Sequence, residues 1–185
     1  MRIIGGLMMI RTFPALAFFL LTTLTVSPFA QSAVRDPHLR SVEVELIDDL
    51  EIGVRVSPTF RQLVARLEAS DIVVYLMFDG SLAPHTDGHV SLMAMAGGRR
   101  YLRLSIDRHT AGCQRLAILG HELQHAVEIA EAADAVDQAS MVSLYRRIGF
   151  RSASGRPESF DSRLAIETGQ QVRREVLAAA ANGSR

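Results

Sequence analysis

The chain has 185 residues and a formal net charge of zero, with 20 basic and 20 acidic side chains. This length is enough for one domain with a substantial hydrophobic core. The balanced charge shows no basic excess, so we expect no binding of nucleic acid. Cys113 is the single cysteine, which excludes an intramolecular disulfide.

The N-terminal residues have the features of a signal peptide. Arg2 and Arg11 supply positive charge, and residues 13–26 form an apolar run. Ala30 and Ala33 are small residues that suit cleavage by a signal peptidase. The apolar run is short for a membrane-spanning helix.

We therefore predict a signal peptide over residues 1–33 and a single domain over residues 34–185. The protein is expected to be exported, to the periplasm or the medium, and to leave the membrane after cleavage. The alternative is that the apolar run remains as an uncleaved anchor.

The first part of the predicted domain combines a short strand, a turn and a helix. Residues 42–46 alternate between apolar and acidic side chains, which predicts a strand. The acidic residues within 48–51 are expected in a solvated turn. Ser57 followed by Pro58 is typical of a helix start, and this helix is predicted to end near Ser70.

Three strands are predicted next, over residues 72–78, 89–96 and 100–106, which are rich in β-branched and apolar side chains. Turn signals at 79–80 and 97–98 separate them. We predict that these strands form an antiparallel meander.

The rest of the chain is predicted to be helical. A helix capped by Thr110 runs to about residue 132, another covers 136–148 and ends at Gly149, and the last covers 159–181. The predicted fold is therefore α+β, with an antiparallel sheet of three or slightly more strands packed on helices.

The sequence H-E-L-Q-H, in the first of these helices, has the spacing of a metal site. At 100° per residue, His121 and His125 lie about 40° apart on one face. Two imidazoles one turn apart suit zinc, and Glu122 lies beside them, where it could be the base for a metal-bound water. The alternative is an exposed histidine pair on a surface helix. Apolar residues gather on the opposite face: Leu116, Leu119, Leu123, Ala126, Val127 and Ala130.

This motif, with its uncharged flanks, resembles that of the zincin metallopeptidases over about ten residues. The resemblance implies a zincin-like fold, a strand immediately before the motif helix, and a peptide or protein substrate bound along the sheet edge by strand addition. The metzincin continuation is absent because Glu128 and Glu131 occupy the matching positions. The thermolysin-like branch, whose third ligand is a Glu on a later helix, is therefore the closer one.

Three carboxylates compete to be the third zinc ligand. Asp161 shares the predicted inward face of the last helix, where a buried carboxylate needs a partner, although it could instead be a first-turn acid. Glu167 lies on a later helix but among polar neighbours. Glu128 lies about 7.5 Å along the helix beyond the level of residue 123, so we expect it as a partner of His125. We predict Asp161 and keep the other two as alternatives.

The predicted function is zinc-dependent peptide hydrolysis. Zinc would polarise the scissile carbonyl, Glu122 would pass a proton from water to the leaving amine, and Tyr145 is a candidate oxyanion stabiliser. A non-catalytic zinc-binding domain of the same fold is the main alternative. An iron enzyme with two histidines and a carboxylate is less favoured, because such triads are usually built on β-barrels.

Overall fold

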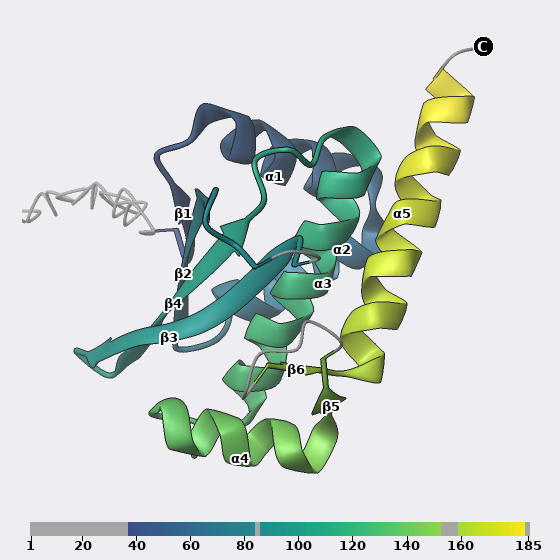
Figure 1. The fold of residues 1–185 in the computed structure, drawn as a ribbon. Coiled ribbons are helices and arrows are strands. Elements are labelled where there is room, and N and C mark those ends of the chain that lie inside the picture. Colours follow the sequence, from purple (N-terminus) through teal and green to yellow (C-terminus); the bar gives the residue numbers. More distant parts are fainter. Residues whose placement is uncertain (1–36, 84–85, 153–158, 184–185) are drawn as a thin grey trace, which may run out of the picture. The chain divides into compact units, whose positions relative to one another are not determined.

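Four strands form a mixed sheet in a computed structural model of the protein, and helices pack against it (Figure 1). The structure describes residues 37–83, 86–152 and 159–183, so the predicted signal peptide lies outside the described residues. The strands are, in spatial order, β1 (Leu39–Ser41), β2 (Ile72–Phe78), β4 (Arg99–Ile106) and β3 (Gly88–Ala96). The prediction of an α+β fold is confirmed, and β3 stands at one edge of the sheet.

The predicted antiparallel meander is wrong for its first strand. β2 pairs with β4 in parallel, with Ile72 opposite Arg100, and pairs on its other side with β1, which was not predicted. Ile72, Val73 and Val74 are all fully buried. A strand that is buried on both faces is typical of a parallel sheet. The apolar run at 72–78 predicts such a strand, but it does not predict which strands pair with it or in which direction.

The hairpin between β3 and β4 follows the prediction, because these two strands pair antiparallel. Gly97 and Gly98 form its two-residue turn with positive φ angles of 57° and 74°. Glycine takes this left-handed conformation readily, and it matches the twist of the two strands.

The predicted strand at 42–46 and the acidic turn after it are also wrong, because helix α1 (Val44–Val56) begins within the first and contains the second. The buried residues Leu46, Asp49 and Gly53 recur at spacings of three and four, which is the period of a helix. Asp49 is buried because its carboxylate accepts a hydrogen bond from Arg115 Nε at 2.5 Å. Packing against distant residues therefore outweighs the alternation of apolar and acidic side chains over residues 42–46.

Helix α2 (Pro58–Glu68) begins as predicted. The Ser57 hydroxyl accepts a hydrogen bond from the backbone N–H of Phe60, and Pro58 occupies the first turn. Phe60, Leu63 and Leu67 are buried in the hydrophobic core beneath the sheet.

Helix α3 (Gly112–Glu131) carries the H-E-x-x-H motif, but Thr110 does not cap it. The Thr110 hydroxyl donates to the carbonyl of Asp107 in the preceding turn, and Ala111 is the N-cap residue. α3 lies beside α5 (Arg163–Gly183) (Figure 1). Their contact depends on glycine, because a Cβ at Gly120 would come within 2.7 Å of Val172.

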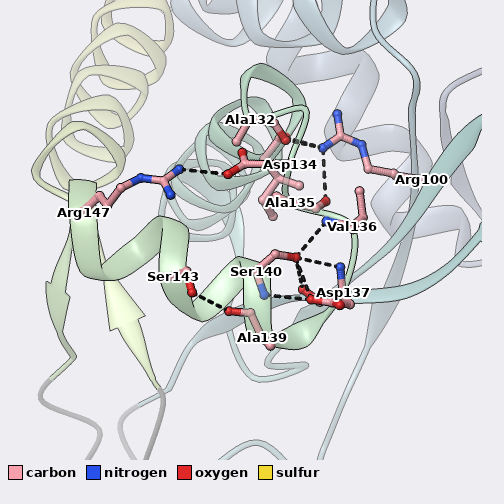
Figure 2. Close-up of polar contacts among 11 residues, drawn as sticks. Arg100, Ala132, Asp134, Ala135, Val136, Asp137, Ala139, Ser140, Ser143 and Arg147 are labelled. Atoms are coloured by element: carbon pink, nitrogen blue, oxygen red, sulfur yellow. Dashed lines mark hydrogen bonds and ion pairs between the residues drawn. The ribbon is translucent and has the colours of Figure 1, made fainter.

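Helix α4 (Gln138–Ile148) lies between these two helices in the chain. A capping box starts it, in which Asp137 and Ser140 satisfy each other's backbone N–H groups (Figure 2). The predicted end at Gly149 is confirmed.

The last helix starts later than predicted. Residues 160–161 form strand β6 (Phe160–Asp161), which pairs antiparallel with β5 (Phe150–Arg151). Ser162 then accepts a hydrogen bond from the N–H of Ala165, as an N-cap residue does. Asp161 is therefore held by a strand, and its predicted place on the inward face of a helix is wrong. Among the described residues, no helix has the length and apolar composition that crossing a membrane requires.

Candidate metal centre

Helix α3 holds the motif residues in the interior of the molecule. Glu122 and His125 are each only 6% exposed, and His121 is partly exposed. Helix α5 covers this part of α3 closely, because a Cβ at Gly169 would come within 3.1 Å of the His121 Cβ. The sequence predicted that the histidines lie on the face of α3 opposite its apolar residues. In the structure α5 packs beside that face, which forms part of a cavity wall.

Asp161 meets both histidines. Its Oδ1 lies 3.4 Å from His121 Nε2 and 3.5 Å from His125 Nε2. One ligand atom from each residue lies within 4.8 Å of the others. We call His121, His125 and Asp161 the metal triad.

These distances fit a shared metal better than they fit direct hydrogen bonds. An N–H···O bond usually spans about 2.7–3.2 Å, whereas two ligands each about 2.1 Å from a tetrahedral ion are about 3.4 Å apart. Two imidazole nitrogens and a carboxylate oxygen are also a donor set that zinc accepts. The triad can therefore hold a divalent metal ion.

A second group of residues orients His125. Its Nδ1 lies 2.9 Å from Glu128 Oε2, and Glu128 Oε1 accepts a 2.5 Å hydrogen bond from the Ser162 hydroxyl. The Tyr145 hydroxyl lies 3.2 Å from the same Nδ1 and donates to the His125 carbonyl at 3.3 Å. Contacts to one imidazole nitrogen fix the ring so that the other can bind a metal.

Burial and charge shape the acid–base properties of the site. Burial is the main cause that raises the pKa of Glu122 to about 7, and the Asp161 charge adds to it. Burial lowers the pKa of His121. For His125 burial acts in the same direction, but the carboxylates of Asp161 and Glu128 outweigh it and raise its pKa to about 10. A metal bound to the triad would therefore displace a proton from His125.

A cavity of about 460 Å³ opens over the triad. Its walls come from β3, α3, α4 and α5, and Glu122 lies on its surface beside Gly88 of β3. A Cβ at Gly88 would come within 2.6 Å of Glu122 Oε1, so a larger residue at position 88 would clash with the Glu122 carboxylate in its present position. The edge strand of the sheet thus borders the candidate base.

The other residues predicted for the site have different places. Glu167 is exposed on α5 and lies outside the metal triad. Glu128 contacts His125 as expected for a supporting residue. Tyr145 lines the cavity, with its hydroxyl engaged by His125. Sequence reasoning missed Gly88 and Ser162, because neither follows a pattern that identifies its distant partner.

Comparisons of the chain with models of protein families, with curated proteins and with solved structures found no match. The geometry of the site is therefore the basis for assigning a function.

Proposed function

We propose that this protein is a zinc-dependent peptide hydrolase. The convergence of two imidazole nitrogens on one Asp161 oxygen, at 3.4 and 3.5 Å, carries the proposal. His121, His125 and Asp161 would hold the ion. When bound, zinc would polarise a substrate carbonyl and lower the pKa of water at the site.

Glu122 is the proposed general base. Its carboxylate makes no hydrogen bond with any described residue, although it is buried beside the metal triad at the cavity surface. A carboxylate so placed can accept a proton from water at one oxygen and donate it to the leaving amine. The Glu128 and Tyr145 side chains would hold His125 in place. Tyr145 is also the candidate oxyanion stabiliser, a role in which its hydroxyl would exchange the bond to the His125 carbonyl for one to the substrate oxygen.

The proposed substrate is an extended peptide or protein segment. β3 stands at the sheet edge, and Gly88, His89, Val90 and Ser91 line the cavity. An extended peptide can add to an edge strand through backbone hydrogen bonds, which would bring its carbonyl groups past the triad.

The test compares wild type with Glu122→Gln. Wild type should contain about one zinc per chain and cleave peptides from a mixed library, detected by mass spectrometry. Glu122→Gln should keep the zinc and lose roughly 10²–10⁴-fold in hydrolysis. A zinc-loaded wild type that cleaves no library peptide would support the non-catalytic zinc-binding alternative instead. Equal hydrolysis by the two proteins would contradict the role of Glu122.

We also propose that the protein is exported through a signal peptide over residues 1–33. The charged start, the short apolar run and the small residues near Ala33 support this. Mass spectrometry of the native protein should find a new N-terminus between about Gln31 and Arg35. Mature protein that retains Met1 would contradict it.

A further inference from the structure

The cavity over the metal triad has two chemically different ends. Helices α3 and α5 run antiparallel, because Ser162 bonds Glu128 near one end and Gly169 meets His121 farther along. Gln170 and Arg173 follow on the same face of α5 and line the cavity. Gln114, from the start of α3, lines it too.

The other end of the cavity, toward α4 and β6, has apolar and neutral polar residues on its wall, the polar ones being Gln138, Ser152 and Ser159. Met141 and Val142 of α4 and Phe160 of β6 line it. Apart from the motif residues and Asp161, the Arg and Asp side chains among the described residues that line the cavity are Arg173 and Asp87.

Arg173 is the one arginine among the described residues that line the cavity, and the chain contains no lysine. Its guanidinium is exposed and makes no hydrogen bond or ion pair with a described residue, Asp87 included. The adjacent Arg174, by contrast, donates two hydrogen bonds to Gln171. A free guanidinium at a cavity wall can bind a carboxylate through two parallel hydrogen bonds.

The spacing along α5 gives the position of this carboxylate. Gly169 lies at the level of His121, and Arg173 is four residues farther, or about 6 Å along the helix axis. An extended peptide advances about 3.3 Å per residue. A distance of this size corresponds to a few residues of an extended peptide, so the group that Arg173 binds would lie within about three residues of the scissile bond.

Resting on the proposed hydrolase function, we infer that Arg173 selects peptides with a carboxylate within about three residues of the bond that is cleaved. The carboxylate can belong to an Asp or Glu side chain or to the C-terminus of the peptide. Gln114 and Gln170 supply neutral amides at the same end of the cavity.

The experiment starts from one peptide that wild type cleaves, resynthesised with Glu or Gln at each of three positions on either side of the cleaved bond. A parallel set ends two residues beyond the bond, with a free or an amidated C-terminus. We expect Glu, or the free C-terminus, to raise kcat/KM roughly tenfold or more at one position, as hydrogen bonds to charged groups do. The first set detects a side-chain carboxylate and the second a terminal one.

Variants identify the residue responsible. Arg173→Gln should abolish the preference, and Arg173→Glu should reverse it in favour of a basic residue. Arg174→Gln is the matched control and should keep it. No difference between acidic and neutral peptides in wild type, or a difference that persists in Arg173→Gln, would overturn the inference.

A binding measurement separates this inference from the proposed function. The Glu and Gln peptides are given a fluorescent label, and fluorescence anisotropy measures their binding to two proteins. One is the Glu122→Gln variant, and the other is the double variant with Glu122→Gln and Arg173→Gln. If Glu122→Gln binds acidic peptides more tightly than neutral ones and the double variant does not, the result supports the subsite. This outcome does not depend on cleavage of any peptide by either variant. Equal binding of acidic and neutral peptides to Glu122→Gln overturns it.

Discussion

Two polar clusters involve helix α3, and they differ in how completely their atoms are bonded. At its C-terminal end, Arg100 is 3% exposed and forms two 2.8 Å hydrogen bonds with the carboxylate of Asp71. The same guanidinium donates to four carbonyl oxygens at 2.7–3.2 Å, and Figure 2 shows two of them, those of Ala132 and Ala135. We call Arg100, Asp71 and these carbonyls the Arg100 cluster; its other two carbonyls belong to Ile129 and Ala130.

The second cluster is the metal triad with Glu122: His121, Glu122 and His125 lie in the middle of α3, and Asp161 approaches them from β6. Asp161 is 3.4 and 3.5 Å from its two histidines, and Glu122 has no hydrogen-bond partner among the described residues. The buried side-chain atoms without a hydrogen-bond partner, among the described residues, are Thr86 Oγ1 and Gln124 Nε2, whereas Glu122 lines the cavity. The Arg100 cluster is therefore fully engaged within the fold, whereas the middle cluster has nitrogen and oxygen atoms that could hold a metal ion.

The largest expected effect comes from breaking the satisfied cluster. Arg100→Leu would leave four helix-end carbonyls and the Asp71 carboxylate without their donor, at a cost of about 3 kcal/mol in the free energy of unfolding. Urea denaturation measures this loss. Arg103→Leu, an exposed arginine on the same strand, is the control and should change stability by less than about 0.5 kcal/mol. A loss below about 1 kcal/mol for Arg100→Leu would contradict the assigned role.

The second experiment removes the proposed third ligand from the incomplete cluster. Asp161→Ala should weaken zinc binding by at least about 100-fold, the upper range for residues that only support a ligand. Competition with a chromophoric chelator measures the affinity. Glu167→Ala is the control, because Glu167 is exposed outside the triad. A larger loss in Glu167→Ala than in Asp161→Ala would reverse the assignment of the third ligand.

A third change tests the room left for Glu122. Gly88→Ala places a Cβ about 2.6 Å from Glu122 Oε1, so the carboxylate has to move. We expect peptide hydrolysis to fall up to about 10²-fold, as small misplacements of a reacting group can cause, with zinc content unchanged. Gly80→Ala has open space around its Cβ and is the matched control. Full activity in Gly88→Ala would show that the position of Glu122 is not critical.

The smallest expected effect concerns another satisfied carboxylate, Glu175 of α5. Burial raises its pKa, but hydrogen bonds from Ser57, Gln171 and Thr59 outweigh burial and lower it below the ordinary value of 4.5. A group with a lowered folded-state pKa stabilises the fold above pH 4.5 and loses this effect as the pH falls through its folded-state pKa.

Glu175→Gln should therefore lower the free energy of unfolding by about 1 kcal/mol at pH 7. The difference from wild type should shrink as the pH falls below 4.5, which denaturation at pH 7, 5 and 3 would show. A difference that is the same at all three values would mean that the charge of Glu175 has no part in it.

Local sequence patterns were sufficient to predict several helices and strands and the two histidines at the centre of the site. The Ser57-Pro58 start, the Gly97-Gly98 hairpin and the helix with His121 and His125 each depend on residues within a few positions of one another. Backbone geometry relates such residues directly, so spacing alone predicts which side chains share a face. The presence of a histidine pair on a helix could therefore be inferred without coordinates.

Only the tertiary structure decided the partners that lie far apart in the chain. The parallel pairing of β2 with β4, the helical state of α1 and the delivery of Asp161 by β6 depend on contacts between distant segments. Asp161 was among the predicted candidates, but for the wrong element. Burial of side chains against distant segments decides between local conformations of similar energy. A local sequence pattern does not identify the distant segment against which it packs.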